Sequence, residues 1–593
     1  MDSKSRQSDT LKKITVPAGL FIAGGVLLST IHPPIGWSFL VWVALVPFIL
    51  ACSPAVKPTT LILTAYILSA CYWLFNLHWV APITAIGWAA FCLYTALLWP
   101  IVALALRYCR VKKIPLFLAV GVVFVGAECL QGFFLGGFFW RFLAHSQYDN
   151  IALIQIADIF GAAGLSFLIA MVNGLLAELI ITARYGTVLT AVNVTKTLVV
   201  CAAVIAAITY GRWRISQEPD ATESGPLVAA LQSNVPQSVK RTFRAEKEIF
   251  SDLMEPSKAA AAAGAQLIVW PETMVQANLD TEIWPFLASA EDVEESAGFD
   301  KALRDHAYAT AYLLIGSYGA AIQYDSLGEM SLLRYNSAFL YRPDGSQDPR
   351  RYDKIHLVMF GEYLPFRKSF HSLYNLLMKF TPYNYDYSLD AGTEYTVFDM
   401  TVPLAGSASN QTKTYRLGVI ICYEDTIPQI ARRFALDKQG RKQLDWLVNI
   451  SNDGWFVQFE DNNQKVTTSA ELAQHAAICA FRAVENRLPI IRSTNTGISC
   501  LIDSMGRIHD GYIASSSDLP AEAISRKGIA GWFIDKMPID KRITFFSKHG
   551  QWLDNCCAIA LVLLIIVPLS AGFVNCKILK TRRVTHLSGH KNE

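Results

Sequence analysis

Charged residues are scarce in this chain of 593 residues, in which Asp, Glu, Lys and Arg together make up 17%. An average soluble domain has roughly 25%. The shortage is concentrated near the N-terminus, where Lys57 is the only charged side chain between Lys13 and Arg107. Hydrophobic residues, in contrast, reach 52%. This composition excludes an all-soluble protein, a disordered chain and a coiled coil, and it predicts that the early part of the chain lies in lipid.

Other absences exclude further classes of protein. The net charge is only +3, which gives no reason to expect a nucleic-acid partner. The 12 cysteines include no pair with C-x₂-C spacing, so we expect neither a metal nor a cofactor. The basic N-terminus resembles the start of a signal peptide, but no A-x-A cleavage site follows it, and we expect its apolar segment to remain as a membrane span.

Eight apolar segments come close to the roughly 20 residues that cross the hydrocarbon core of a membrane. Their approximate cores are Thr15–Ile31, Trp37–Cys52, Thr59–Trp79, Ile86–Leu106, Ile114–Phe134, Gly161–Ile181, Thr197–Gly211 and Cys556–Asn575. We therefore expect a membrane domain with seven spans over residues 1–211, a globular domain over residues 212–550, and an eighth span with a basic tail over residues 551–593.

The basic side chains of the short loops indicate the orientation. Those that share one side with the basic N-terminus are Lys57, Arg107, Arg110, Lys112, Lys113, Arg184, Lys196, Lys577, Lys580, Arg582 and Arg583. Short loops rich in Lys and Arg stay in the cytoplasm. Seven crossings then place the globular domain outside, facing the periplasm or an equivalent space.

In the globular domain, short apolar runs alternate with helical patterns. The predicted strands are Leu227–Gln232, Gln266–Trp270, Tyr312–Ser317, Asn336–Tyr341, Arg416–Ile421, Trp446–Asn452 and Ile498–Asp503, and the predicted helices are Thr242–Ala263 and Ser469–Glu485. Turn motifs at Arg342–Gly345 and Asp503–Gly506 indicate two hairpins. Alternating strands and helices predict a layered α/β domain.

Three of the strand ends carry reactive side chains, which are Glu272, Lys354 and Cys422. A carboxylate can take the proton of a thiol, and an ammonium can stabilise the oxyanion that forms when the thiolate attacks a carbonyl. The product of that attack is an acyl thioester, which water or an amine can resolve. The three residues together predict nucleophilic catalysis.

Each of these residues also has a simpler interpretation. A cysteine at the end of a strand is most often a packed hydrophobe. Glu272 could be an acid at a helix N-terminus, and Lys354 a solvated charge. Cys479 and Cys500 fit the packed interpretation, because both lie on apolar faces of the predicted elements.

The motifs around the three residues resemble a known family. Trp270–Glu272, Tyr352–Lys354 and Cys422–Glu424 are similar to the three signatures of the nitrilase superfamily of carbon–nitrogen hydrolases. The longer strings Lys354–Pro365 and Ile450–Phe456, together with the membrane spans, resemble the apolipoprotein N-acyltransferase family of the bacterial inner membrane. The loop residues Gly137–Trp140, Gln147 and Gln155 are similar to a loop of that family. The resemblance implies a nitrilase-like αββα sandwich on a multi-pass helical membrane domain.

The resemblance also implies a reaction and its residues. The enzyme would take an acyl chain from a phospholipid, typically phosphatidylethanolamine, and pass it to the α-amino group of diacylglyceryl-cysteine in an apolipoprotein. Glu272 would be the general base, Lys354 the oxyanion stabiliser and Cys422 the nucleophile. Supporting or substrate-binding roles would belong to Glu362, Tyr423, Glu424, Trp455, Phe456 and Arg241.

Three positions depart from the family pattern. Met359 and Phe139 stand where the family usually has proline, and Arg241 stands where it commonly has a substrate-contacting tryptophan. A guanidinium at that position could contact lipid phosphate instead. We therefore expect that Arg241→Ala weakens the use of phospholipid and that Arg241→Trp is tolerated.

Two further features allow alternative interpretations. The segment Phe370–Phe380 is apolar at helical spacing and is either a helix packed on its own domain or an arm that dips into the membrane interface. Glu128 is a carboxylate within a predicted span, and such a group is functional or paired. The sequence identifies no partner for it.

Two other functions compete with acyl transfer. A membrane-tethered amidase would use the same three residues, with water resolving the thioester, but one span would suffice to tether it. A transporter with a degenerate outer domain would need charged residues along its path through the membrane, and the early spans have almost none.

Overall fold

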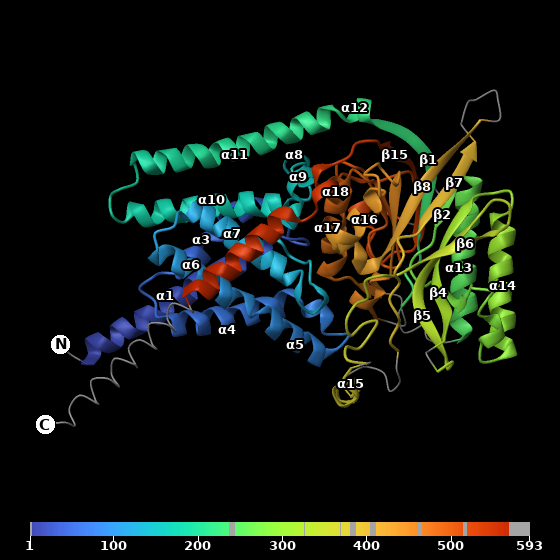
Figure 1. Cartoon of the computed structure of the whole chain (residues 1–593), viewed down its shortest axis with the longest axis horizontal. Helices are drawn as coiled ribbons and strands as arrows, with labels where there is room; N and C mark the ends of the chain where they lie inside the picture. The colour runs from blue at the N-terminus through green and yellow to red at the C-terminus, as the bar shows by residue number, and fades with distance from the viewer. Residues whose placement is uncertain are drawn as a thin grey trace.

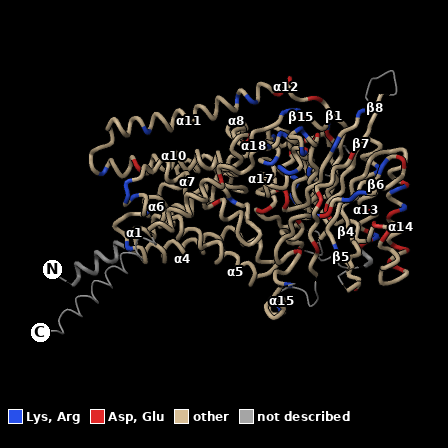
Figure 2. The backbone as a smooth tube through the Cα atoms, in the orientation of Figure 1, with Lys and Arg blue, Asp and Glu red and all other residues tan. Residues whose placement is uncertain are grey.

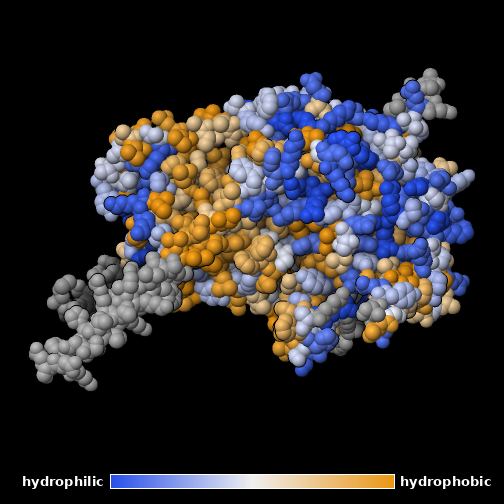
Figure 3. Space-filling model, viewed as in Figure 1, coloured by the Kyte–Doolittle hydropathy of each residue, from blue (hydrophilic) through white to orange (hydrophobic). Residues whose placement is uncertain are grey.

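The computed structural model describes residues 3–236, 243–324, 327–367, 369–379, 387–403, 411–460, 465–513 and 519–568. A helical half and an α/β half lie side by side, with the N-terminus at the far end of the helical half (Figure 1). Lys, Arg, Asp and Glu are sparse along the helices and frequent in the α/β half (Figure 2). The surface of the helical half is correspondingly hydrophobic (Figure 3).

The helical half is built from elements between residues 3 and 216. The α-helices are α1 (Ser3–Thr30), α2 (Val41–Ala44), α3 (Val46–Ala51), α4 (Pro58–Asn76), α5 (Ala85–Thr95), α6 (Leu98–Val111), α7 (Leu116–Gln131), α8 (Ile151–Ile154), α9 (Ala157–Phe160), α10 (Ala162–Ala183) and α11 (Ala191–Ser216). Short 3₁₀ turns lie between them, namely η1 (Ser38–Leu40), η2 (His78–Val80), η3 (Phe134–Gly136) and η4 (Leu143–Gln147). A last apolar helix, Trp552–Pro568, returns to this half.

Four helices of the described chain are long and apolar enough to cross a membrane. They are Pro58–Asn76, Ala85–Val111, Ala162–Ala183 and Ala191–Ser216. Shorter apolar helices cover Ile14–Thr30, Ser38–Ala51, Leu116–Gln131, Ile151–Phe160 and Trp552–Pro568. The predicted second span is broken into η1, α2 and α3, and the predicted eighth extends past the described residues. The count of eight spans therefore stays a prediction.

The α/β half contains two large sheets and a small hairpin. The first sheet has the order β15-β1-β2-β4-β5-β6, with β3 on β4, and the second has the order β14-β13-β12-β9-β8-β7. The strands are β1 (Thr222–Gln232), β2 (Leu267–Val269), β3 (Val275–Asn278), β4 (Tyr312–Tyr324), β5 (Met330–Tyr341), β6 (Gln347–Asp353), β7 (Val397–Pro403), β8 (Thr412–Ile421), β9 (Trp446–Ser451), β10 (Gln458–Glu460), β11 (Lys465–Thr467), β12 (Ile490–Thr494), β13 (Cys500–Ile502), β14 (Ile508–His509) and β15 (Gly531–Asp540). In each sheet the central strands are parallel, as β1, β2 and β4 are in one and β8, β9 and β12 are in the other.

Helices cover the outer faces of both sheets and complete four layers. The helices of this half are α12 (Glu218–Ala221), α13 (Phe243–Ala262), α14 (Ala290–Ala307), α15 (His371–Met378), α16 (Pro428–Ala435), α17 (Ala470–Asn486) and α18 (Phe545–His549), with the 3₁₀ turns η6 (Trp284–Phe286), η7 (Cys422–Thr426), η8 (Asp453–Phe456) and η9 (Ala523–Ser525). One apolar core joins Val228 and Leu314 of the first sheet to Val419 and Ile490 of the second. α13 and α14 lie outside the first sheet, and α16 and α17 lie between the second sheet and the membrane helices (Figure 1). The predicted αββα sandwich is confirmed.

The predicted elements of this half all form, although four strands are longer than expected: β1, β5 and β8 begin earlier, at Thr222, Met330 and Thr412, and β4 ends later, at Tyr324. The seven predicted strands correspond to β1, β2, β4, β5, β8, β9 and β13, and the two predicted helices to α13 and α17. Both predicted hairpins form, between β5 and β6 and between β13 and β14.

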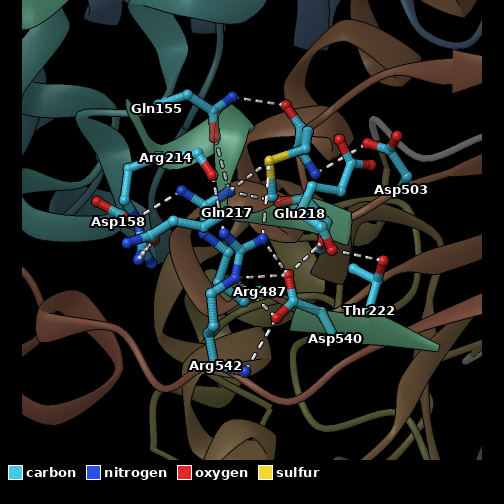
Figure 4. Close-up of polar contacts among 12 residues, drawn as sticks. Gln155, Asp158, Arg214, Gln217, Glu218, Thr222, Arg487, Asp503, Asp540 and Arg542 are labelled. Carbon is cyan, nitrogen blue, oxygen red and sulfur yellow. Dashed lines mark hydrogen bonds and ion pairs between the residues drawn. The ribbon is translucent and has the colours of Figure 1, made fainter. Parts of the chain in front are cut away.

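A buried polar cluster fastens the two halves together, as Figure 4 shows. This junction cluster consists of Gln155, Asp158, Arg214 and Arg487. Arg487, just after α17, donates to Gln155 Oε1 at 2.6 Å and to Asp158 Oδ2 at 2.7 Å. Asp158 also accepts from Arg214 Nε at 2.7 Å. The α/β half is thereby held to α8, α9 and α11 of the helical half.

Candidate active site

Glu272 follows β2 on a tight turn in the first sheet. Gly316 of the neighbouring β4 makes room for this turn, because a Cβ on Gly316 would lie 2.4 Å from the carbonyl oxygen of Pro271. Glu272 is 5% exposed. Its Oε2 accepts from the backbone N–H of Asn452 at 2.6 Å, and its Oε1 accepts from Asn336 Nδ2 at 2.6 Å. The carboxylate is thus fixed from both sheets.

Lys354 follows β6 and is almost fully buried. Its Nζ donates to Glu362 Oε1 at 2.8 Å and lies 3.4 Å from Glu272 Oε1. Asn336 Nδ2 also donates to Glu362 Oε1, at 3.0 Å. Burial lowers the pKa of Lys354, but the carboxylates of Glu362 and Glu272 outweigh this effect and hold the pKa well above its usual value. The lysine is therefore a permanent ammonium between two acids.

Cys422 begins η7, directly after β8 in the second sheet. Its φ of 52° is left-handed, a conformation that is strained for a side chain with a Cβ and that presents a nucleophile on a sharp strand-to-helix turn. Burial and the negative charge of Glu272 raise the pKa of the thiol, whereas the positive charges of Lys354 and His475 lower it. The structure thus brings the thiol into electrostatic reach of both other predicted catalytic residues. A protonated resting thiol needs a base before it can attack.

Glu424 lies on the same turn and is fully buried. Its Oε1 accepts from the N–H groups of Ile355 and His356 at 2.7 and 3.0 Å. Its Oε2 accepts from the N–H of Ile421 at 2.7 Å and from the hydroxyl of Tyr352 at 2.8 Å. Burial raises the pKa of Glu424 to about 7, against the opposing effect of these donors. Because both oxygens already have protein donors, this geometry favours support of the nucleophile over contact with substrate.

Tyr423 lies on η7 (Cys422–Thr426), the nucleophile turn, and connects this turn to the membrane half. Its hydroxyl donates to the carbonyl of Gly137 at 3.1 Å and accepts from the N–H of Phe139 at 3.3 Å. Its ring stacks on Trp140 with centroids 6.5 Å apart. Proline has no N–H. The departure from the family pattern at Phe139 therefore supplies one of the two hydrogen bonds of Tyr423.

The remaining predicted site residues lie around this centre. Phe456 packs edge-on against Trp79 of the membrane half, with centroids 5.0 Å apart, and Trp455 is half-buried beside it on η8. Met359 lies against Gly136 of the membrane loop. Arg241 lies outside the described residues, so the two expectations about its variants stay predictions.

The segment predicted as a packed helix or an arm forms α15, with Phe380 outside the described residues. The described part of α15 has no buried residue. Phe370 is 65% exposed and Leu376 is 49% exposed. The structure favours the arm over the packed helix.

Glu128, for which the sequence identified no partner, is paired. Its Oε1 accepts from the backbone N–H of Leu143 at 2.7 Å, and the side chain of Ser166 is also hydrogen-bonded to it. This carboxylate, on the apolar helix α7, therefore secures the loop between α7 and α8.

Sequence reasoning missed two sets of residues near the site. One is Asn336, the amide that joins Glu272 to Glu362. The other is a buried group of ionisable side chains beside the nucleophile turn, formed by Asp425, Asp453, Glu471, His475 and Arg492. The ligand atoms of Asp453, Glu471 and His475 lie within 4.8 Å of one another, a spacing that a cation could use. The i,i+4 spacing of Glu471 and His475 was the signal available in the sequence.

Two family models divide the chain in the same way as the structure. The model described as apolipoprotein N-acyltransferase N-terminal domain matches residues 24–175, and the model described as carbon-nitrogen hydrolase matches residues 227–532. A solved amidase of the nitrilase superfamily from Nesterenkonia AN1 matches with 15% identity and a TM-score of 0.32, over 56% of this chain and 94% of that one. The two family models, and not this structural match, define the chain as a nitrilase-like enzyme built onto membrane helices.

Relatives narrow this class to one family. The apolipoprotein N-acyltransferase of Geobacter metallireducens is 32% identical over 504 residues, which cover 82% of this chain and 85% of that protein. Apolipoprotein N-acyltransferase 1 of Treponema denticola is 24% identical over 580 residues, which cover 92% and 94% of the two chains. The chain belongs to the apolipoprotein N-acyltransferase family and is an integral membrane acyltransferase. The predicted family is confirmed, and the acyltransferase interpretation is supported over the amidase.

Proposed function

We propose that this protein transfers an acyl chain from a membrane phospholipid, through a thioester on Cys422, to the α-amine of diacylglyceryl-cysteine at the N-terminus of an apolipoprotein. Phosphatidylethanolamine is the expected donor. The observation that carries the proposal is the buried arrangement of Glu272, Asn336, Lys354 and Glu362 within electrostatic reach of Cys422.

In the first half-reaction the thiol of Cys422 is acylated. Glu272 takes the thiol proton as the sulfur attacks the ester carbonyl of the phospholipid, and the ammonium of Lys354 stabilises the oxyanion. The carbon–sulfur bond forms, the ester carbon–oxygen bond breaks, and the lysophospholipid oxygen leaves with the proton from Glu272. The raised pKa of the Cys422 thiol supports proton transfer to Glu272 during the attack, because the resting sulfur is protonated and needs a base.

In the second half-reaction the amine of the lipoprotein attacks the thioester. The carbon–nitrogen bond forms and the carbon–sulfur bond breaks. The proton released by the amine passes through Glu272 to the thiolate, which restores the starting enzyme. The donor product must leave before the acceptor enters, so the kinetics should be ping-pong.

The position of the site supports lipid substrates. Tyr423 ties the nucleophile turn to the loop Gly137–Trp140 of the membrane half, and Phe456 packs on Trp79 of that half. α15 lies at the lower edge of the catalytic half (Figure 1), and its Leu373 and Leu376 are exposed. We further propose that the protein lies in the bacterial inner membrane with its catalytic half in the periplasm, as the basic loops indicate.

The proposal is tested by following a labelled acyl chain with the purified full-length protein. With labelled phospholipid alone, mass spectrometry should find the acyl mass on the Cys422 peptide, and hydroxylamine should remove it. A diacylated lipopeptide should then receive the label in amide linkage. Cys422→Ala should lose both signals, while Cys479→Ala and Cys500→Ala should keep both. Full transfer by Cys422→Ala would overturn the proposal, and release of free fatty acid without transfer would favour the hydrolase.

A further inference from the structure

Five ionisable side chains form a buried cluster beside the nucleophile turn, and the proposed reaction uses none of them. This inner ion cluster consists of Asp425, Asp453, Glu471, His475 and Arg492, each no more than 2% exposed. Asp425 belongs to η7, Asp453 to η8, Glu471 and His475 to α17, and Arg492 to β12. Four elements that carry or surround the active site therefore meet at one point.

His475 lies at the centre of this cluster with a carboxylate on each side. Its Nε2 is 2.7 Å from Asp425 Oδ1. Its Nδ1 is 3.2 Å from Glu471 Oε1 and 3.4 Å from Asp453 Oδ1. Only Nε2 is hydrogen-bonded, to Asp425, whereas Nδ1 faces Asp453 and Glu471 with no hydrogen-bond partner among the described residues. Because Asp425 and Asp453 flank the ring on opposite sides, their charges stabilise the imidazolium. Burial lowers the pKa of His475, but Asp425 and Asp453 reverse this effect and raise it well above the usual value.

The charges of the cluster balance when Glu471 is neutral. Arg492 pairs with Asp425, and its second nitrogen lies 3.8 Å from Asp453 Oδ2. Burial raises the pKa of Glu471 to about 7. Two cations then face two anions, the condition under which buried charges are tolerated. The imidazolium explains the cluster without a bound ion.

The partners of His475 lie on the two turns that form the active site. Asp425 is on the nucleophile turn, three positions after Cys422. Asp453 begins the turn that carries Trp455 and Phe456, and the residue before it donates its N–H to Glu272. Fixing Asp425 relative to Asp453 therefore fixes the nucleophile relative to its base.

The helix that carries His475 is itself anchored to both halves of the molecule. The neighbouring Gln474 donates to the carbonyl of Pro33 at 2.7 Å and accepts from the indole of Trp140 at 2.7 Å. About two turns further along, Arg482 donates to the carbonyl of Thr426, also on the nucleophile turn, at 2.7 Å. These hydrogen bonds hold α17 to both halves and thereby fix the position of His475.

We propose that His475 is a positioning residue for acyl transfer, whose imidazolium locks the nucleophile turn to the turn after β9 and places a positive charge near the sulfur of Cys422. The inference rests on the proposed function for its effect on acylation, but its effect on the thiol does not depend on any substrate. The charged and titratable groups that face the ring are Asp425, Asp453, Glu471, Arg492, Cys422 and Tyr423.

The test compares the full-length protein with His475→Gln and with His475→Gln/Asp425→Asn, which removes one charge of each sign and keeps the cluster balanced. His306→Gln is the matched control, since His306 pairs with Ser257 on the far side of the catalytic domain. Alkylation of Cys422 by iodoacetamide is followed from pH 6 to 10 by mass spectrometry of its peptide. Thioester formation with phospholipid is measured in parallel.

Loss of the cation should move the alkylation profile of Cys422 up by about one pH unit, which is about tenfold less thiolate at a fixed pH. Thioester formation should slow at least about tenfold in every variant that retains its melting transition, and the control should match the wild type. An unchanged alkylation profile in folded His475→Gln, or thioester formation at the wild-type rate in the folded double variant, would overturn the proposal. So would a stoichiometric metal ion whose removal by a chelator abolishes activity, because His475 would then be a ligand. Failure of the wild type to form any thioester would instead refute the proposed function, and the alkylation result would still stand.

Discussion

At the scale of single residues, Glu272, the proposed general base, is held by a neutral amide as well as by Lys354. Asn336 Nδ2 donates to Glu272 Oε1 at 2.6 Å and to Glu362 Oε1 at 3.0 Å, and so bridges two carboxylates that would otherwise repel each other. Lys354 lies between the same two acids. A single amide therefore sets the separation of the base and the acid that orients the lysine.

Removal of this amide should slow catalysis without unfolding the enzyme. We expect Asn336→Ala to lower the rate of thioester formation roughly 10- to 100-fold, since the base loses a positioning hydrogen bond. Asn336→Asp should slow thioester formation further, because it places a third carboxylate beside Glu272 and Glu362. Single-turnover assays with labelled phospholipid measure the effect. Equal rates for Asn336→Ala and the wild type would show that Lys354 alone positions the base.

Substitution of the base should have opposite effects on two reactions of the same thiol. The negative charge of Glu272 raises the pKa of Cys422, so Glu272→Gln should lower that pKa and speed alkylation at pH 8 to 9. The same change should slow acylation by phospholipid roughly 10²- to 10⁴-fold, because the base is lost. In the wild type, alkylation should still rise with pH at pH 9, since the thiolate fraction grows until the raised pKa is passed. Slower alkylation in Glu272→Gln would place the carboxylate away from the sulfur.

At the scale of elements, α15 is exposed over its described length and presents apolar side chains to the surroundings. We expect Leu373→Glu and Leu376→Glu to reduce the use of phospholipid in vesicles, because a charged side chain opposes insertion into the interface. Alkylation of Cys422 by a soluble reagent should not change. Tyr308→Glu, at a similarly exposed position after α14, is the control. If the vesicle assay is unaffected, α15 does not contact lipid.

The elements and the site residues differ in how well the sequence predicts them. The strands β2, β8 and β9 are short apolar runs bounded by turn residues, and each was predictable. β15 was missed because Lys536 and Pro538 interrupt its pattern, and a proline is tolerated there since β15 is an edge strand. The three reactive residues were predictable because each lies at the end of a predicted strand, within a recognisable motif. Asn336 was not, because its partners are distant in sequence and only packing brings them together. For His475 the sequence offered only the i,i+4 spacing to Glu471, and packing brings Asp425 and Asp453 to it.

At the scale of the whole molecule, the predicted orientation can be tested directly. A reporter placed at the hairpin turn Asp344–Gly345 should be outside the cytoplasm, whereas one in the tail Lys577–Arg583 should be inside. Alkaline phosphatase and green fluorescent protein fusions at both positions should give opposite signals. The same signal from both would require an even number of crossings between them, and the predicted final span would be wrong.

The junction cluster of Figure 4 joins the two halves, and substitutions of its members should differ in their cost to stability. Asp158 accepts from Arg214, from Arg487 and from the hydroxyl of Tyr210, so Asp158→Asn leaves the buried guanidinium of Arg487 and the partly buried one of Arg214 without their shared anion. Breaking a buried ion pair in this way costs about 3–5 kcal/mol. Arg487→Met leaves Asp158 with two of its three donors and should cost less. Asp158→Asn should therefore lower the melting temperature in detergent more than Arg487→Met does.

The double variant and an exposed control make this comparison decisive. Asp158→Asn/Arg487→Met removes one of the two unpaired cations, so it should melt above Asp158→Asn alone, a non-additivity expected for residues in one network. Asp149→Asn, at an exposed position just before α8, should melt like the wild type. Because both halves contribute to the active site through Tyr423 and Trp140, acyl transfer should fall along with the melting temperature in the cluster variants. The contrary result would be that Asp158→Asn and Arg487→Met melt at the same temperature and that their effects add in the double variant. The cluster would then be a set of independent ion pairs, not one cooperative network that joins the membrane helices to the catalytic domain.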